Sequence, residues 1–406
     1  MALTTGRGRG RFTVAAVAVS TALGVAAAPS ASAAPSVTTV LTGLNTPRGV
    51  AFDGDGRLYV SESGVFSGTK AAALNRTGRV TVYRENDHRW TKAWGSSGFE
   101  SLSSTENGPE VLGPEGISAV GDDCGGGDES DGCQVRMIMS ESIAGVAASE
   151  HLTASQLGFL YALDPATGRP QRLLNVGDLQ YRWTAQHKSL APHDFPDSNP
   201  YAVLITKGAG ERHDHGGSRN RTFVADAGAN TINEIRGGSL RVLSYIPNDP
   251  KFDSTPTCIA QGRDGMLYVG TLDLLTNSIL TKAGPKLGAN PGHSNVWRVD
   301  PDASYPTRPQ LWATGLTTVT ACTFDRAGNF WATEMFHLNA QGAPGDLVKI
   351  AARDVAQRRT NHVVHIGGGS LPLPGGIAQG DDGALYVSVN SANPAPRSGQ
   401  VMRVAP

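Results

Sequence analysis

The sequence predicts an all-β protein, a six-bladed β-propeller of four-stranded antiparallel blades whose ring is closed by the N-terminal strand. Three observations support this prediction. A strand–turn–strand unit occurs six times, each copy is followed by further strand-like segments, and Ser36–Leu44 resembles the fourth strands of the repeats. Self-similarity at this period indicates a repeat architecture, and repeated four-stranded antiparallel units are typical of propellers.

Each repeat begins with two hydrophobic strands joined by a polar turn. The first copy, Thr46–Glu62, has ValAlaPhe before the turn AspGlyAspGly and LeuTyrVal after it. Gly and Asp suit such hairpin turns because the turns require positive φ angles. The other copies are Thr255–Thr271, Thr320–Glu334 and Leu373–Val389, with two that insertions interrupt, Gly113–Val120 with Arg136–Glu141 and Asn199–Thr206 with Thr222–Asp226.

The remaining strands of each blade follow in order. Third strands are expected at residues 78–85, 158–168, 230–238, 294–302, 345–354 and 399–406, and fourth strands are clearest at 241–246 and 310–316. The chain stops after a third strand, so Ser36–Leu44 is expected to supply the outer strand of the last blade. Closure of this kind pairs a strand edge that would otherwise be open.

Residues 1–33 are expected to be a secretory signal peptide, followed by a single propeller domain over residues 34–406. Arg7, Arg9 and Arg11 precede the apolar run Phe12–Ala28, and AlaSerAla at 31–33 is typical of a cleavage site. No later stretch is long and apolar enough to span a bilayer, and no Cys lies near the cleavage point for a lipid anchor. A freely secreted, extracellular monomer without a membrane anchor is therefore expected.

The charge and the cysteines narrow the possible partners. The formal net charge is −1 and no block of Lys or Arg follows the signal, which disfavours nucleic acid and anionic membranes. Four cysteines in an exported chain suggest disulfides. Cys124 and Cys133 flank an acidic insertion and are expected to be bonded. For Cys258 and Cys322, a bond across two blades and two buried thiols are equal alternatives.

The repeat brings two rings of side chains to one opening, because the first strand of each blade starts on the face where the second strand ends. First strands start at Arg48, Glu115, Tyr201, Thr257, Ala321 and Gly375. Second strands end at Glu62, Glu141, Asp226, Thr271, Glu334 and Val389, with Asn390 next to the last. Carboxylates from distant parts of the sequence are therefore expected to converge.

Clustered carboxylates raise one another's pKa unless a cation or an Arg lies among them. Their oxygens suit Ca²⁺ or Mg²⁺, with Glu62, Asp226 and Glu334 as candidate ligands, and Arg48 is the obvious organic counter-charge. The residues expected to bind a ligand are Arg48, Glu62, Glu115, Glu141, Tyr201, Asp226, Glu334 and Asn390. The alternative is that these side chains are solvated or pair with Arg and backbone N–H groups.

Three insertions give weaker signals. GluArgHisAspHisGlyGly at 211–217 offers two His for a metal, but no third ligand is fixed by spacing and an exposed loop is favoured. Residues 122–133 form an acidic loop without EF-hand spacing. Residues 181–200 enter the third repeat on the acidic side and are a candidate lid or partner surface. No Walker, HExxH or GxSxG motif is present.

The phrases TPRGVAFDGDGRLYVSESG, SNPYAV, FVADAGANTINEI and LPGGIAQGDDGALYVSVN resemble the ScyD/ScyE family of secreted bacterial proteins over essentially the whole mature chain. This resemblance implies the fold and export but no activity. The chain is more distantly similar to NHL and gluconolactonase-like propellers. The latter bind a divalent cation in the central opening through Glu, Asn and Asp. Glu62 has a comparable place here, whereas the Asn ligands have no clear counterpart.

Three functions are compatible with these features. The first is binding of a polar small molecule or polymer at the acidic opening, with or without a divalent cation. The second is metal-assisted hydrolysis of a lactone or ester, with Glu62, Glu115 or Glu334 as general base. The third is an extracellular protein-interaction scaffold whose insertions make the contacts. The catalytic residues and the identity of the ligand are not specified by the sequence.

Overall fold

A computed structural model describes residues 35–405 of the chain, apart from residues 69–71, 88, 106–108, 123, 125–132, 207–219, 249–251, 283, 305 and 339–341. Residues 35–406 form one compact unit. The proposed signal peptide and the HisAspHis loop lie outside the described residues. In the described part of the chain, no helix has the length and apolar character needed to cross a membrane.

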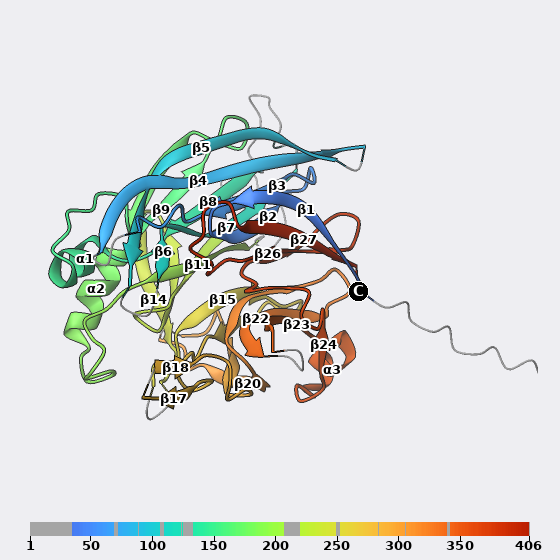
Figure 1. Cartoon of the computed structure of the whole chain (residues 1–406). Coiled ribbons are helices and arrows are strands. Elements are labelled where there is room, and N and C mark those ends of the chain that lie inside the picture. Colours follow the sequence, from blue (N-terminus) through green and yellow to red (C-terminus); the bar gives the residue numbers. More distant parts are fainter. Residues whose placement is uncertain are drawn as a thin grey trace, which may run out of the picture. The chain divides into compact units, whose positions relative to one another are not determined.

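The described residues form a six-bladed β-propeller, which confirms the predicted fold class (Figure 1). From the channel outward, blade 1 contains β2 (Pro47–Phe52), β3 (Leu58–Glu62), β4 (Ala73–Asn86), β5 (Arg89–Ser104) and β6 (Glu110–Leu112). Blade 2 contains β7 (Pro114–Val120), β8 (Gln134–Met139), β9 (Phe159–Leu163) and β10 (Pro170–Asn175). Blade 3 contains β11 (Pro200–Thr206), β12 (Arg221–Asp226), β13 (Thr231–Arg236) and β14 (Ser239–Tyr245).

The other three blades have the predicted four strands each. Blade 4 contains β15 (Pro256–Gln261), β16 (Leu267–Thr271), β19 (Ser294–Val299) and β20 (Gln310–Leu316). Blade 5 contains β21 (Val319–Phe324), β22 (Phe330–Leu338), β23 (Pro344–Ile350) and β24 (Val363–Ile366). Blade 6 contains β25 (Ile377–Gln379), β26 (Leu385–Val389), β27 (Gly399–Ala405) and the N-terminal strand β1 (Ser36–Leu44). β1 pairs antiparallel with β27, so the predicted ring closure is confirmed.

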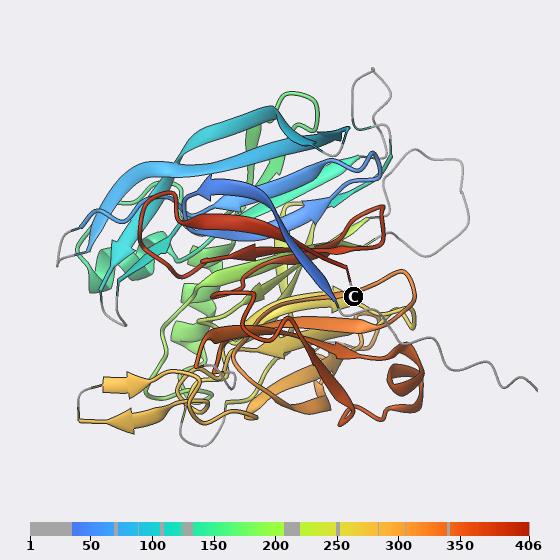
Figure 2. The same ribbon diagram turned by 45° about the vertical axis from the view of Figure 1, so that its right-hand side comes forward.

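Blade 1 differs from the prediction because it has a fifth strand. β4 and β5 form a long hairpin along one edge of the molecule in Figure 1, and β6 pairs with the end of β5. A separate hairpin of β17 (Ile279–Thr281) and β18 (Gly284–Lys286) projects from blade 4 and is the gold pair of arrows in Figure 2. Three short helices, α1 (Ile143–Ser149), α2 (Val176–Gln186) and α3 (Ala352–Gln357), lie in connections between strands.

The turns that join first and second strands follow the predicted chemistry. Gly56, Gly265, Gly328 and Gly383 all have positive φ angles. The turn aspartates also accept a hydrogen bond from an aromatic residue of the second strand: Tyr59 to Asp53 (2.8 Å), Tyr268 to Asp264 (2.9 Å), Trp331 to Asp325 (2.8 Å) and Tyr386 to Asp382 (3.3 Å). The repeated Asp therefore fixes the turn to the strand that follows it.

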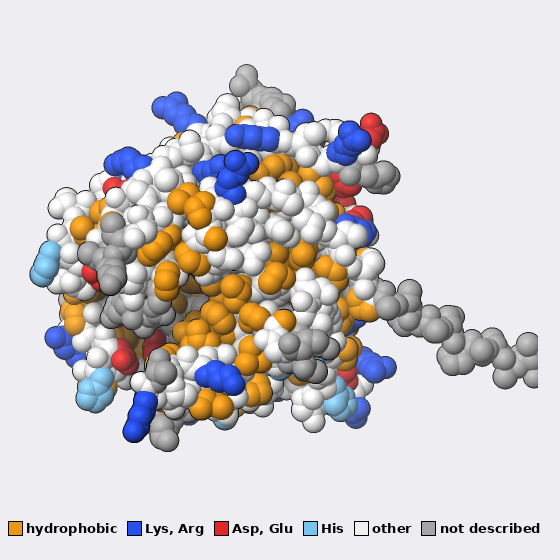
Figure 3. All heavy atoms as spheres, in the orientation of Figure 1, with side chains coloured by type: hydrophobic (Ala, Val, Ile, Leu, Met, Phe, Trp, Pro, Cys, Tyr) orange, Lys and Arg blue, Asp and Glu red, His pale blue; other side chains and the backbone are white. Residues whose placement is uncertain are grey.

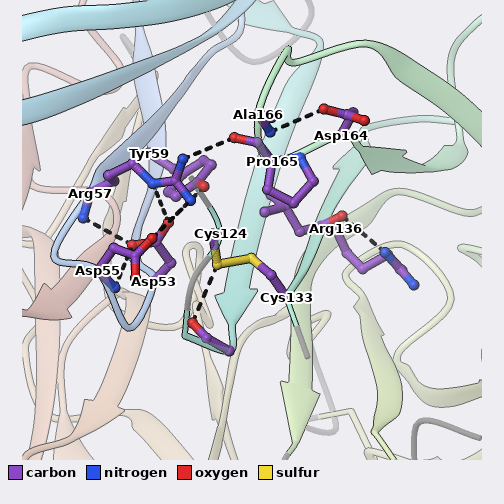
Figure 4. Close-up of a disulfide and its surroundings, with 12 residues drawn as sticks. Asp53, Asp55, Arg57, Tyr59, Cys124, Cys133, Arg136, Asp164, Pro165 and Ala166 are labelled. Carbon is purple, nitrogen blue, oxygen red and sulfur yellow. Dashed lines mark hydrogen bonds and ion pairs between the residues drawn. A yellow bond between two sulfur atoms is a disulfide. The ribbon is translucent and has the colours of Figure 1, made fainter. Parts of the chain in front are cut away.

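Both cysteine pairs form disulfides, Cys124–Cys133 and Cys258–Cys322. Figure 4 shows the first beside the turn of blade 1, where the buried Arg57 donates to Asp53 (2.7 Å) and to the carbonyl of Pro165 in blade 2 (3.1 Å). The second joins the innermost strands of blades 4 and 5, which decides between the two alternatives left open by the sequence. Both disulfides therefore lie at contacts between blades or their loops.

Hydrophobic side chains fill the interfaces between neighbouring blades. The buried clusters combine strands of adjacent blades, for example Val80 and Phe99 of blade 1 with Met137 and Tyr161 of blade 2. On the surface in Figure 3, hydrophobic side chains gather over the middle of this face, and Lys and Arg lie mainly toward its periphery. Burial between blades, rather than in one central core, is the expected packing of a radial repeat.

Candidate functional site

The innermost strands enclose a cavity of about 90 Å³ at the centre of the propeller. A second cavity of about 380 Å³ continues toward the opposite face. The two share a ring of apolar residues at equivalent positions of the six innermost strands: Val50, Ile117, Val203, Ile259, Cys322 and Ile377. The channel is therefore polar at one end and constricted by apolar side chains in the middle.

The polar end, called the mouth below, is formed by residues at which the first strands start. Arg48, Glu115, Tyr201, Thr257 and Thr320 line it, with Gly376 from blade 6. In blade 5, Val319 pairs with Glu334 as Pro256 pairs with Thr271, so Thr320 occupies the position that the sequence assigned to Ala321. Ala321 is the next residue and also lines the cavity.

Glycines at the second position of these strands bring the blades close together around the mouth. A Cβ on Gly116 would lie 2.7 Å from the carbonyl oxygen of Tyr201, and one on Gly376 would lie 2.5 Å from that of Arg48. The amide of Gly376 donates to the same Arg48 carbonyl at 2.7 Å. Such backbone contact requires glycine and narrows the channel. It also places the side chains of Arg48, Glu115 and Tyr201 within reach of one another.

Arg48 and Glu115 form a buried ion pair in the mouth. The Nε of Arg48 lies 3.5 Å from Oε1 of Glu115, and the two residues are 9% and 1% exposed. Arg48 Nη2 donates to the carbonyl of Val111 at 2.8 Å, and Ser63 donates to Glu115 Oε1 at 3.2 Å. Tyr201 interacts electrostatically with Arg48. Arg48 Nε and Glu115 Oε2 are buried without a hydrogen-bond partner. Buried polar atoms normally have a hydrogen-bond partner, so these two atoms depart from the usual pattern.

Burial raises the pKa values of the acidic groups in this cluster. It raises the pKa of Glu115 to about 7, and the charge of Glu110 adds to this effect while Arg48 and Ser63 oppose it. Burial likewise raises the pKa of Tyr201 to about 12. Burial alone lowers the pKa of Arg48, but the nearby Glu115, Tyr201 and Glu110 together outweigh it and the net shift is upward. Glu115 can therefore gain or lose a proton near pH 7 while Arg48 stays charged.

A second acidic group lies near the mouth on blades 2 and 3. Burial and then the charge of Asp197 raise the pKa of Glu141 well above its usual value. Burial and the charge of Asp226 raise the pKa of Asp197 to about 7. Burial raises the pKa of Asp226 and that of Asp253 to about 6 in each case, against hydrogen bonds from Ser198 and from the Asn230 amide, respectively. Mutual repulsion is therefore strongest on this side of the opening.

Four of the predicted strand-end residues, and Asn390, have protein partners. Glu62 accepts two hydrogen bonds from Arg79, at 2.6 and 2.7 Å, and a third from the amide of Asn45. Asp226 accepts from Ser198, Asn199 and Ala229. Glu334 accepts from the amide of Thr317 (2.7 Å) and from His337 (2.6 Å). The Thr271 hydroxyl donates to Asp273, and Asn390 donates to the carbonyl of Ser398 (3.0 Å).

In blade 2, Pro114 pairs with Met139, so Glu141 lies two residues beyond the strand-end position, at a φ of 64°. The proposed cation set of Glu62, Asp226 and Glu334 stays a prediction. In the described part of the chain, two groups have ligand atoms that all lie within 4.8 Å of one another. One is Asp53 with Cys124 and Cys133, whose sulfurs are in a disulfide. The other combines Glu334 with His337, Asp346 and His365.

The insertion at residues 181–200 supports the acidic side of the opening. Its first turns belong to α2, where the buried Gln180 donates to Asn233 of blade 3 at 2.7 Å. Thr184 donates to the carbonyl of Asp197 at 2.9 Å, which fixes Asp197 near Glu141 and Asp226. The insertion is therefore packed onto blade 3, and its role as a partner surface stays a prediction.

Several site residues were not identified from the sequence. Glu110, Asp197 and Asp253 lie outside the repeated strand ends, so the alignment of repeats gives no signal for them. Arg79 could have been found, because it stands at the start of the third strand, directly opposite Glu62. His337 and His365 lie outside the strand segments that the repeat pattern assigns.

Comparison with known proteins finds solved structures that are similar to this chain in fold, at low sequence identity. No family model matches the chain, and no curated protein does. Among solved structures, the PQQ domain of pyranose dehydrogenase from Coprinopsis cinerea is 13% identical, with 92% of this chain and 96% of that chain covered and a TM-score of 0.49. A gluconolactonase from Xanthomonas campestris is 10% identical (91% and 89% covered, TM-score 0.46), and virginiamycin B lyase from Staphylococcus aureus is 12% identical (92% and 99% covered, TM-score 0.44). These values carry no argument about activity, and the resemblance to ScyD/ScyE proteins stays a prediction.

Proposed function

We propose that the protein binds a polar, hydroxylated ligand at the mouth of its channel, through Arg48, Glu115 and Tyr201. The observation behind this proposal is that Arg48 Nε and Glu115 Oε2 are buried without a hydrogen-bond partner, in two residues that line the same cavity. A ligand hydroxyl can accept from the guanidinium and donate to the carboxylate, so one group satisfies both atoms. Leaving such atoms unpaired costs about 1–3 kcal/mol each, which a bound ligand recovers.

The size of the cavity restricts how such a ligand binds. About 90 Å³ admits one small group and a few waters, so the rest of a larger ligand lies over the opening. There it lies near the carboxylates of Glu141 and Asp197. A divalent cation bridging these carboxylates and the ligand would lower their mutual repulsion. A sugar-like small molecule or the end of a hydroxylated polymer fits this arrangement.

The experiment is a binding screen by thermal shift and calorimetry with polyols, sugar acids and oligosaccharides, with and without Ca²⁺ or Mg²⁺. Arg48→Lys and Glu115→Gln are expected to weaken the binding of any hit at least about tenfold, because the first removes the guanidinium donors and the second removes the negative charge. Asp264→Asn, in a turn on the opposite face, is the matched control and should bind normally. Equal affinity in all variants would contradict the proposal.

The pKa of Glu115 favours hydrolysis of a lactone or ester as a second candidate. A general base works best when its pKa is near the working pH, and the pKa of Glu115 is about 7. Of the three carboxylates considered from the sequence, Glu62 and Glu334 are already held by Arg79 and His337. A lactone panel should then show turnover that rises through pH 7 and is lost in Glu115→Gln. Undiminished turnover in that variant would exclude Glu115 as the base.

Export to an oxidising compartment is part of the proposal. Two disulfides account for all four cysteines, and structural disulfides are rare in reducing compartments. Expression of the full chain should give disulfide-bonded protein in the culture medium. Protein retained in the cytoplasm with free thiols would contradict export.

A further inference from the structure

Two carboxylates and two imidazoles meet on blade 5, away from the Arg48–Glu115 pair. Glu334 lies in the middle of β22, His337 follows in the same strand, Asp346 lies in β23 and His365 in β24. His337 Nδ1 is 2.6 Å from Glu334 Oε2, and His365 Nδ1 is 2.8 Å from Asp346 Oδ2 and 3.7 Å from Glu334 Oε2. None of the four residues lines the central cavity.

The two carboxylates face each other in a way that calls for a cation. Glu334 and Asp346 are directly paired between β22 and β23, and they are 0% and 5% exposed. Like charges at directly opposite positions of a sheet destabilise it. Within the described part of the chain, the ion-pair partners of these two carboxylates are His337 and His365. Nitrogen and oxygen donors thus surround a point between the strands.

An irregularity in β22 places His337 in this cluster. Pairing passes from Glu334 with Asp346 to Leu338 with Pro344, so β22 contains two more residues than β23 over this interval. In a regular strand, residues three apart point to opposite faces. The extra residues break that alternation and turn the His337 ring toward Glu334, as bulges do beside functional sites.

We propose that Glu334, His337, Asp346 and His365 form a binding site for one transition-metal ion, of which Zn²⁺ is the expected species. The ligand atoms all lie within 4.8 Å of one another, so modest side-chain movement brings them to one ion. Two imidazoles and two carboxylates suit the four-coordinate preference of Zn²⁺, whereas Ca²⁺ and Mg²⁺ prefer oxygen alone. The His337 and His365 side chains are 21% and 44% exposed, which gives the ion access from solvent.

The test is metal binding by protein purified without a histidine tag and stripped with a chelator. Equilibrium dialysis against Zn²⁺, followed by metal analysis, should give about one ion per chain, and Co²⁺ should give the visible absorption of a tetrahedral site. His365→Gln and His337→Gln should each weaken Zn²⁺ binding at least about tenfold. If His337→Gln does not fold, the more exposed His365→Gln alone decides.

Two controls separate this site from other histidines. His362→Gln changes a 60% exposed histidine of the same blade, which lies 3.6 Å from Asp354, and should bind Zn²⁺ normally. The double variant His213→Gln/His215→Gln removes the histidines of the 211–217 loop and should also bind normally. Loss of Zn²⁺ only in the loop variant, or no Zn²⁺ uptake by the wild-type protein, would overturn the proposal and leave the cluster as histidine–carboxylate ion pairs.

Discussion

The two halves of the wall around the mouth are built from the same repeat position but carry different chemistry. Blades 1, 2 and 3 contribute Arg48, Glu115 and Tyr201. Blades 4 and 5 contribute Thr257 and Thr320, and blade 6 has glycine there. One half therefore presents charge and unpaired hydrogen-bonding atoms, and the other presents small hydroxyl groups. The propeller frame does not require this asymmetry, which agrees with the ligand binding proposed above for the charged half.

The halves also differ in how their blades are joined. In the charged half, glycines allow direct backbone contact between neighbouring strands, as Gly116 does with Tyr201. In the small half, the position equivalent to Gly116 is Cys258, and it is bonded to Cys322 of the next blade. A covalent bond joins blades 4 and 5 there, while Gly376 of blade 6 keeps close backbone contact with Arg48. The small half, which contains the Cys258–Cys322 disulfide, is thus expected to stabilise the fold. The charged half is expected to lower the stability, because its buried charges are placed for binding.

The largest effect on stability should come from removing the disulfide in the small half. Cys258→Ala/Cys322→Ala opens a link between residues 64 apart, worth about 4 kcal/mol of unfolding free energy in the chain-entropy model. The matched control, Cys124→Ala/Cys133→Ala, opens a link over 9 residues and should lose about 2.6 kcal/mol. Denaturant unfolding measures both. Equal losses would mean that the bond between blades has no special role.

A smaller loss of stability should follow when the charged half loses the guanidinium of Arg48. Arg48→Met leaves Glu115 buried without its partner, which should cost about 3 kcal/mol at pH 8. At pH 5 Glu115 is protonated, so the loss should be much smaller. The double variant Arg48→Met/Glu115→Gln should recover most of the stability at pH 8. A loss independent of pH would show that Arg48 acts through packing alone.

The wild-type protein should be more stable in mild acid than above neutral pH. The pKa of Glu115 rises from 4.5 to about 7 on folding, so between these values the folded protein holds a proton that the unfolded chain has released. Its contribution is fully present below pH 4.5 and is lost as the pH rises through 7. Asp197 and Asp226 shift in the same direction. Unfolding measured at pH values from 5 to 8 should show a fall in unfolding free energy on the order of 2 kcal/mol. Glu115→Gln should make this fall smaller.

The fold could be predicted from the sequence because local sequence features mark where the strands of the repeats begin and end. The Asp and Gly of four turns, the β-branched runs on either side and the spare strand Ser36–Leu44 are local signals that agree with one another. The extra strand β6 escaped prediction because it is three residues long and occurs in one blade only. The Cys258–Cys322 bond could not be decided because it depends on the distance between two strands.

The site was only partly predictable, for a different physical reason. Repeat alignment places Arg48, Glu115 and Tyr201 at one opening, since strand starts are fixed by the fold. It does not show which partner each side chain finds. Glu62 and Glu115 looked alike in sequence, yet Arg79 neutralises the first while the second keeps an unpaired oxygen. Histidines outside the repeat pattern, such as His365, gave no signal at all.

The smallest effect should come from Tyr201→Phe, which changes only the link between Arg48 and the third blade. Loss of the Tyr201 hydroxyl, which interacts with Arg48, should cost about 1 kcal/mol of unfolding free energy. Thr257→Val in the other half also removes one hydroxyl, which donates to the carbonyl of Val319, and should cost a similar amount. The two variants differ in binding, because Tyr201 orients the guanidinium that a ligand meets. Titration with a hydroxylated ligand should show weaker binding for Tyr201→Phe and unchanged binding for Thr257→Val; equal weakening would remove the distinction between the two halves.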